Sequence, residues 1–428
     1  MSVRRLPTVV LSALLGVLLT VSGTALYVSA AGSSGPHETW LDSWSAAQIP
    51  AGDVLGPNWS TAGFAGHTIR QTVRPTLAGE SVRITLSNLF GERPLPITAA
   101  TIAQAAEGAA VRSGTVRPLS FGGAPGTVIP PGAELTGDAI DYPVNARQSL
   151  TVTLYLGRPT GPATFHYLAN STTYRAIGDH SADIDGGAFN ESSRSWYYLT
   201  GVAVVGRPNR DGVVVFGDSL TDGAGAWPDM DNRYPDVLAD RLAVAGRPPA
   251  VLNTGIGGNR VVSDSAYVGP RAATRFRRDV LDKEGIGTVL LLSGINDIGA
   301  SEVHEPWMRP NPEVTAGQLI AEYRLLIRMA RADGLRIVGG TLPPYRGALY
   351  YSERGERVRD AVNAWIRGSG EFDAVADFER VLADPADPDV LAARFDSGDH
   401  LHPGPAGYSA MAGAAVGVLT GQADQAKE

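Results

Sequence analysis

The stretch Gly212-Val-Val-Val-Phe-Gly-Asp-Ser-Leu-Thr-Asp-Gly223 joins an apolar run to a sharp turn. Three valines and a phenylalanine predict a buried β-strand that ends abruptly at Gly217. Ser219 therefore lies at the tip of this strand. A serine hydroxyl is a weak nucleophile until a neighbouring base takes its proton. The stretch predicts a catalytic serine only if a base and an acid are found elsewhere, and otherwise Ser219 caps the next helix.

Strand-like and helix-like segments alternate from this stretch to the C-terminus. The expected strands are 213–216, 250–253, 288–292, 336–339 and 372–376, and the expected helices are 234–245, 270–281, 312–332, 352–366 and 405–419. Such alternation predicts a parallel sheet with helices on both faces, and five strands fit a flavodoxin-like, three-layer α/β/α domain. Functional groups of such a sheet gather where its strands end, at the carboxyl edge.

A base and an acid follow the last predicted strand, in Asp399-His-Leu-His402-Pro. Residues three apart face the same side of a turn, so Asp399 can accept the Nδ1 proton of His402 and leave Nε2 free for Ser219. Pro403 keeps His402 out of helical geometry, and His400 should point elsewhere. The alternatives are a solvated loop, or a metal site formed by Asp396, Asp399, His400 and His402.

Two further blocks follow predicted strands: Asn253-Thr-Gly-Ile-Gly-Gly-Asn259 and Gly294-Ile-Asn-Asp297. With Gly217-Asp-Ser219 and the Asp399/His402 block, in this order, they make the chain from about 212 to about 420 resemble the SGNH (GDSL) esterase and lipase family. The resemblance implies a serine esterase with a catalytic triad of Ser219, Asp399 and His402. The turn lacks the Gly-x-Ser-x-Gly elbow of the α/β-hydrolases, because Thr221 stands at the second glycine position.

The resemblance also implies an oxyanion hole. Its donors would be the N–H of Ser219, the N–H of Gly258 and the side-chain amide of Asn296, which stabilise the charge that develops on the ester oxygen. Gly257 is the alternative to Gly258, and Asn296 could instead close a turn with Gly294.

The glycine cluster does not predict a nucleotide site. Arg260 stands where a dinucleotide-binding motif needs its third glycine, and no clear helix begins there. No cofactor and no metal is therefore expected. Weaker candidates remain: Trp307, Met308 and the segment 341–346 could line the substrate cleft or merely pack at its rim. Asp222 is expected to hydrogen-bond within its own turn.

The residues before this domain predict an all-β sandwich of the jelly-roll type. Short runs such as 68–74, 81–86 and 150–155 alternate apolar and polar residues between glycines and prolines, so each should have one buried face and one wet face. We expect a β-sandwich accessory domain at 38–206 and the hydrolase domain at 211–421.

Composition narrows the class of protein. A net charge of −8 argues against nucleic acid as a partner, and the absence of cysteine excludes disulfides and thiolate chemistry. Residues 1–31, with two arginines before an apolar run, predict a signal peptide or an N-terminal anchor, and hence a secreted or cell-envelope protein that touches membrane only if the anchor is retained.

The sequence therefore predicts a secreted serine esterase that forms an acyl-enzyme on Ser219. Similarity in domain order to bacterial esterases grouped with acetyl-xylan esterases implies short acyl chains, such as acetyl groups on carbohydrate. One alternative is an acyltransferase with the same site. The other is a glycan-binding envelope protein with a vestigial hydrolase domain, binding through Trp40, Trp44 or Trp196, although aromatic residues of this kind are more often core residues.

Overall fold

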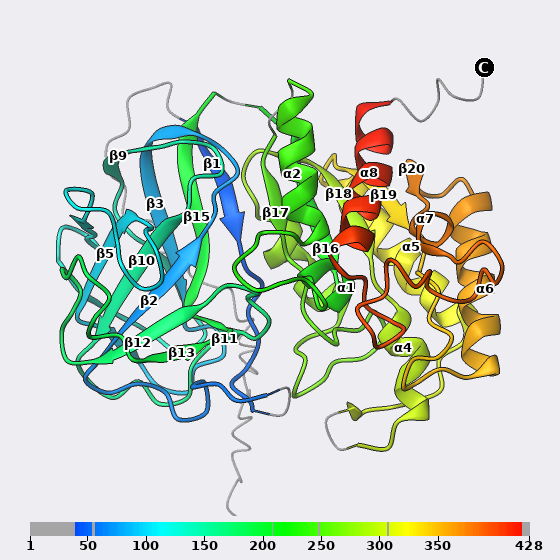
Figure 1. The fold of residues 1–428 in the computed structure, drawn as a ribbon, viewed down its shortest axis with the longest axis horizontal. Coiled ribbons are helices and arrows are strands. Elements are labelled where there is room, and N and C mark those ends of the chain that lie inside the picture. The colour runs from blue at the N-terminus through cyan, green and yellow to red at the C-terminus, as the bar shows by residue number, and fades with distance from the viewer. Residues whose placement is uncertain (1–38, 54–55, 208, 247–248, 306–307, 422–428) are drawn as a thin grey trace, which may run out of the picture.

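The chain forms two halves that lie side by side in Figure 1. The structure, a computed structural model, describes residues 39–53, 56–207, 209–246, 249–305 and 308–421. Strands β1 to β15 make up the β-sandwich half, and β16 to α8 make up the α/β half. The predicted N-terminal targeting segment, residues 1–31, lies outside the described residues. Among those that are described, no helix combines the length and the apolar character needed to cross a membrane.

The β-sandwich half contains two main antiparallel sheets, ordered β1-β15-β3-β8 with β9 also on β3, and β13-β12-β2-β10-β5-β6. Its strands are β1 (Thr39–Ser45), β2 (His67–Val73), β3 (Gly79–Ser87), β4 (Leu95–Ile97), β5 (Ala99–Gln104), β6 (Arg117–Pro118), β7 (Thr127–Ile129), β8 (Glu134–Thr136), β9 (Ile140–Val144), β10 (Leu150–Leu156), β11 (Phe165–His166), β12 (Thr173–Ile177), β13 (Glu191–Ser193), β14 (Trp196–Tyr197) and β15 (Leu199–Gly206). Apolar side chains from both sheets share one hydrophobic core. The predicted sandwich is confirmed, while its jelly-roll connectivity stays a prediction.

The prediction of a wet face on each strand was wrong for β2 and β10. On β2, Thr68 and Arg70 are buried although they alternate with apolar residues. The segment that follows β12 covers them: Thr68 Oγ1 donates to the carbonyl of Gly178, and Arg70 donates to the carbonyl of Asp185. Thr153 of β10 is buried as well. A periodic pattern reveals which residues share a face, but not whether a distant loop covers that face.

The α/β half is built on one parallel sheet in the order β17-β16-β18-β19-β20. Its strands are β16 (Gly212–Gly217), β17 (Val251–Asn253), β18 (Ile286–Leu292), β19 (Arg336–Gly340) and β20 (Ala374–Ala376). Its helices are α1 (Ser219–Asp222), α2 (Tyr234–Val244), α3 (Ala272–Phe276), the π-helical turn η1 (Arg277–Leu281), α4 (Ile295–Gly299), the 3₁₀ turn η2 (Ala300–Glu302), α5 (Ala316–Ala332), α6 (Glu353–Gly368), α7 (Phe378–Leu382) and α8 (Pro405–Thr420).

The sheet order confirms the predicted flavodoxin-like domain. Strand β16 lies inside the sheet, where all six of its residues are buried between helical layers. Helices α2 and α8 pack together, and α5 packs against α3 and α6. Every predicted strand and long helix is present with small shifts at its ends, whereas the predicted helix at 270–281 continues from α3 into η1. The short helices α1, α4 and α7 were not predicted, because four or five residues are too few to show a helical period.

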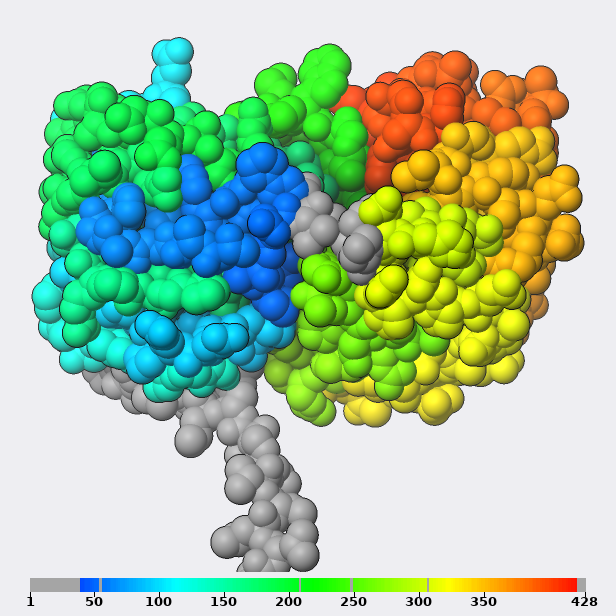
Figure 2. Space-filling model, turned by 90° about the horizontal axis from the view of Figure 1, so that it is seen from below, coloured from blue at the N-terminus to red at the C-terminus, as the bar shows by residue number. Residues whose placement is uncertain are grey.

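The two halves are joined by a tight interface. Figure 2 shows them in direct contact, with the β-sandwich half in blue to green and the α/β half in green to red. Asp42 of β1 exchanges two hydrogen bonds with Glu284, and the N–H of Val251 in β17 donates to Thr76 Oγ1 at 3.1 Å. Asp240 of α2 pairs with Arg74 at 3.3 Å. The edge strand of the parallel sheet is thus covered by the other half.

A buried arginine holds the carboxyl edge of the sheet together. The guanidinium of Arg275 donates to the carbonyl of Gly217 at 2.7 Å, to the carbonyl of Thr254 at 2.7 Å and to Asn259 Oδ1 at 2.9 Å. It also forms an ion pair with Asp279 at 2.9 Å, with no part of its side chain exposed. The ends of β16 and β17 are therefore fixed to α3 by one side chain.

We expect Arg275→Met to lower the free energy of unfolding by about 3–5 kcal/mol, because three buried acceptors lose their donor and Asp279 loses one of its two arginine partners. Chemical denaturation of both proteins measures the difference. Arg277→Met is the matched control, since Arg277 lies two residues away but is 72% exposed in its pair with Asp282. A loss for Arg275→Met no larger than that of the control would contradict this role.

Candidate active site

Ser219 is the first residue of α1 and lies at the carboxyl end of β16. The helix is capped by Asp218, whose Oδ1 accepts the N–H of Leu220 at 3.1 Å. Ser219 Oγ instead lies 2.8 Å from His402 Nε2. The capping alternative for Ser219 was therefore wrong, because its neighbour does that task. Gly217 is required before this turn, since a Cβ there would lie 2.0 Å from the carbonyl oxygen of Leu292.

His402 is held by Asp399 as the three-residue spacing predicts. His402 Nδ1 lies 2.6 Å from Asp399 Oδ2, while Asp399 Oδ1 accepts the N–H groups of Leu401 and His402. Since a carboxylate can only accept, Nδ1 carries the proton and the Nε2 lone pair faces Ser219. Burial opposes the ionised form, but these hydrogen bonds hold the pKa of Asp399 well below its usual range. The Asp399 carboxylate therefore stays ionised at neutral pH.

His400 takes no part in this contact. Its Nδ1 lies 2.7 Å from Asp396 Oδ2, so the loop contains two separate His–Asp pairs. The expectation that His400 points elsewhere agrees with this pairing. In the described part of the chain, Asp396, Asp399, His400 and His402 do not form a group within common ligand distance. The alternative of a metal site in this loop is therefore not supported.

The predicted oxyanion donors lie on the neighbouring loops. The N–H of Gly257 donates to Asp222 Oδ2 at 2.8 Å, so the alternative of Gly257 as donor is not available. For the N–H of Gly258, no acceptor occurs among the residues that the structure describes. Gly258 has a φ of +76°, and a Cβ there would lie 2.7 Å from Val268 Cγ1. Both the backbone conformation and the space thus require glycine at this position.

Asn296, in α4, is oriented by two partners. Its Nδ2 donates to the carbonyl of Asn259 at 3.1 Å, and its Oδ1 accepts from the hydroxyl of Tyr350 at 3.3 Å. These contacts fix which end of the amide is the donor and leave the second N–H of Nδ2 available. Asn296 is therefore not occupied in closing a turn with Gly294. The catalytic roles of Ser219, Asp399, His402, Gly258 and Asn296 stay predictions that this geometry permits.

The weaker candidates that the structure describes pack against other side chains. Met308 and Tyr345 are buried in the core of the α/β half, which agrees with packing rather than lining of a cleft. Trp307 lies outside the described residues. Trp44 and Trp196 pack edge to face at 4.8 Å and are buried, so they offer no free surface to a glycan. Trp40 is partly exposed, but its ring is covered by the guanidinium of Arg83.

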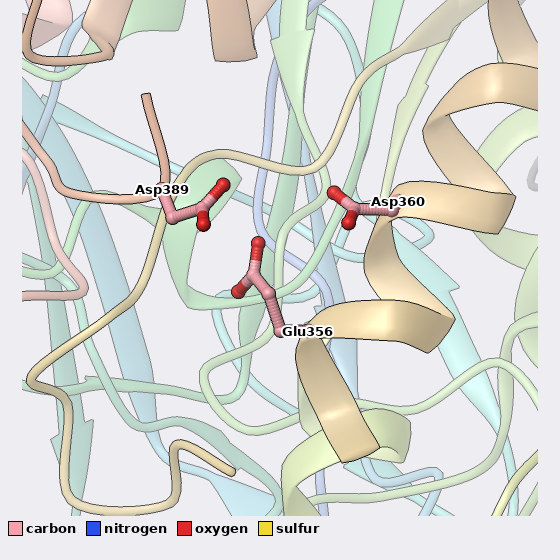
Figure 3. Close-up of side chains that lie close together, drawn as sticks. All are labelled: Glu356, Asp360 and Asp389. Carbon is pink, nitrogen blue, oxygen red and sulfur yellow. The ribbon is translucent and has the colours of Figure 1, made fainter. Parts of the chain in front are cut away.

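One group of carboxylates outside the site has the spacing of metal ligands. Glu356 and Asp360 project from α6 towards Asp389, and Figure 3 shows the three converging. The guanidinium of Arg359 stands among them: its Nη2 contacts Glu356 and lies 3.6 Å from both Asp360 Oδ1 and Asp389 Oδ1. Because an arginine already supplies the positive charge at this position, we assign no metal to it.

Sequence reasoning missed three residues that shape the site: Arg275, Tyr350 and His166. The spacing of Arg275 and Asp279, four residues apart on a helix, is the pattern of an ordinary surface pair. Asp222 was expected to hydrogen-bond within its own turn. Its backbone N–H does so, donating to the carbonyl of Asp218 at 2.8 Å, but its side chain instead binds the N–H of Gly257 and the side chain of His166, the latter at 3.0 Å. Nothing in the local sequence of these residues signals such contacts.

Asp218, the residue before Ser219, is fully buried. Burial raises the pKa of Asp218 to about 7, and the nearby carboxylate of Asp297 adds to the shift. Its Oδ2 has no hydrogen-bond partner among the residues described. In the same way, burial raises the pKa of Asp297 to about 6. Ionising either carboxyl therefore has an energetic cost in the folded protein.

We expect Asp218→Asn to be increasingly stabilising as pH rises from about 5 to about 8. A carboxyl whose pKa is higher in the folded chain than in the unfolded chain stabilises the fold below its unfolded value of about 3.9, and this contribution is lost as pH rises through about 7. Asparagine retains an oxygen for capping α1 but cannot ionise. Calorimetric melting temperatures of variant and wild type across this range test the sign. A difference that is constant or shrinks with pH would contradict a titrating Asp218.

Comparison with known proteins gives one family. Residues 215–410 match the model of the GDSL-like Lipase/Acylhydrolase family. A search of curated proteins gave no match. The chain is similar to three solved structures: a GDSL-like lipase from Bacteroides thetaiotaomicron (18% identity, TM-score 0.34, 51% of this chain and 89% of that chain), an acetylxylan esterase from Geobacillus stearothermophilus (20%, 0.38, 50% and 95%) and an alpha/beta hydrolase enzyme from the metagenome of Lake Arreo (19%, 0.38, 50% and 96%).

Proposed function

Because residues 215–410 belong to the GDSL-like lipase/acylhydrolase family, we propose that the protein is a secreted serine esterase that forms an acyl-enzyme on Ser219. The observation that carries the proposal is the hydrogen-bonded succession Asp399–His402–Ser219, with heavy-atom distances of 2.6 and 2.8 Å. Its two domains are proposed as 38–206 and 211–421, and the predicted segment 1–31 is the reason to propose export.

The proposed reaction has two halves. His402 Nε2 takes the Ser219 proton while Oγ attacks the ester carbonyl, forming a C–O bond and a tetrahedral oxyanion. The N–H groups of Ser219 and Gly258 and the Nδ2 of Asn296 stabilise that oxyanion. The C–O bond to the alcohol then breaks, and the alcohol leaves with the proton from His402. Water, deprotonated by His402, attacks the acyl-enzyme and releases the acid and free Ser219.

We expect Ser219→Ala and His402→Ala each to lower kcat for p-nitrophenyl acetate by about 10⁴–10⁶-fold, because both groups act as one unit in proton transfer and attack. His400→Ala is the matched control: it removes a histidine two residues away that pairs with Asp396. Initial rates of p-nitrophenol release measure all three. Substantial activity in Ser219→Ala, or equal losses for His400→Ala and His402→Ala, would overturn the proposal.

A short acyl group on a carbohydrate is the substrate that we propose. Trp227 is 61% exposed and stands in the loop that follows α1. Two residues earlier, Gly225 abuts the residue after His402, since a Cβ on Gly225 would lie 2.6 Å from the carbonyl oxygen of Pro403. The loop that carries this indole therefore packs against the catalytic histidine loop. An exposed aromatic face beside a site is suited to the apolar face of a sugar ring.

We expect Trp227→Ala to lower kcat/KM for acetylated xylan by about 5–20-fold, the effect of about 1–2 kcal/mol of lost apolar contact. Turnover of p-nitrophenyl acetate, which has no sugar, should stay within about twofold. Ile177→Ala, which removes an exposed apolar side chain of β12, is the control. Equal losses on both substrates, or faster turnover of long-chain than of acetyl esters, would contradict the substrate assignment.

A further inference from the structure

The loop that carries Gly258 is anchored outside the half that carries the triad. Ile256, two residues before Gly258, is 2% exposed and belongs to the hydrophobic core of the β-sandwich half, together with Phe165 and Tyr197. Gly257 faces the ring of Tyr167, which a Cβ on Gly257 would meet at 3.8 Å. The position of the predicted oxyanion donor therefore depends on the half that the family match does not cover.

Asp222 links this loop to the turn of the nucleophile. It is the last residue of α1, three residues after Ser219, and is 1% exposed. Its Oδ2 accepts the N–H of Gly257 at 2.8 Å, and its Oδ1 lies 3.0 Å from His166 Nε2. One buried carboxylate thus contacts both the loop that carries Gly257 and Gly258, the oxyanion loop, and a side chain of β11.

The partners of His166 determine its protonation. Its Nδ1 lies 2.7 Å from the carbonyl oxygen of Ala47, and its Nε2 faces the carbonyl oxygen of Leu168 at 3.2 Å as well as Asp222. Carbonyls and carboxylates only accept, so both ring nitrogens must donate and the ring is an imidazolium. Burial opposes this charge, but the Asp222 carboxylate outweighs it and raises the pKa of His166. The contact is a buried ion pair between the two halves.

We infer that His166 is a positioning residue for the ester-cleaving site: from the β-sandwich half it fixes Asp222, and through Asp222 it fixes the Gly257 amide, so that the adjacent Gly258 N–H remains directed at the oxyanion. The inference rests on the proposed function. A strong buried contact is needed because Gly258, at a positive φ, stands in a loop that bears no regular secondary structure. The β-sandwich half is thereby part of the catalytic apparatus and more than a neighbouring module.

His166→Gln tests the inference by removing the charge and one of the two donors. We expect kcat for p-nitrophenyl acetate to fall by about 10–100-fold with KM changed by less than about threefold. A displaced oxyanion donor weakens stabilisation of the transition state more than binding of the substrate. The control is Asp240→Asn, which breaks another ion pair between the halves, with Arg74 and Arg147, away from the oxyanion loop. It should keep kcat within about twofold.

Asp222→Asn tests the same link from the α/β half and serves if His166→Gln does not fold. Asparagine keeps an oxygen for the Gly257 N–H but loses the charge that His166 binds. We expect a similar fall in kcat. The double variant should have about the same kcat as either single variant, because the two side chains act as one unit. Additive losses, unchanged kcat in His166→Gln, or an equal loss in Asp240→Asn would overturn the inference.

A readout without substrate separates this inference from the proposed function. Hydrogen exchange at the Gly257 amide, followed by NMR or by mass spectrometry of a peptide spanning 254–259, should be at least about tenfold faster in His166→Gln and unchanged in Asp240→Asn. If the wild type cleaves no ester, the proposed function fails while this exchange result still decides whether His166 holds the loop. Unchanged exchange in His166→Gln would overturn the inference even if the esterase is active.

Discussion

The contact between Ser219 Oγ and His402 Nε2 joins residues 183 positions apart, and the organisation of the site depends on it. No local preference can form this contact. It exists because β16 ends inside a parallel sheet whose strands all place their carboxyl ends at one edge, where the loop before α8 also arrives. A serine on an edge strand or at the other end of β16 would have the same neighbours in sequence but no histidine to take its proton.

Neighbouring residues in the short turn after β16 make different contacts. Asp218 caps α1, so Ser219 keeps its hydroxyl for His402, while Asp222 reaches across to the oxyanion loop. Burying Asp218 raises its pKa to about 7, which is an energetic cost of placing a carboxyl next to Ser219. The guanidinium of Arg275 donates to the carbonyl of Gly217 at the end of β16. Buried ionisable groups at a site are typical where positioning outweighs stability.

Much of this arrangement can be predicted from the sequence. The alternation of strands and helices predicts the five-stranded sheet, and the three-residue spacing predicts the pairing of Asp399 with His402, because both depend on local periodicity. The contacts of His166 and Arg275 cannot be predicted in this way, since each depends on which distant segments meet in the fold. The prediction that the threonine and arginine of β2 are exposed is wrong for the same reason, because a loop some 110 residues further along the chain covers them.

The most direct test of the central claim is to identify the residue that becomes covalently modified. Incubation with a fluorophosphonate, proteolysis and mass spectrometry should place one phosphonyl group on Ser219, with labelling abolished when His402 is replaced by alanine and retained when His400 is replaced. Modification of a different residue, or labelling of Ser219 that does not depend on His402, would contradict an account in which that imidazole activates that hydroxyl.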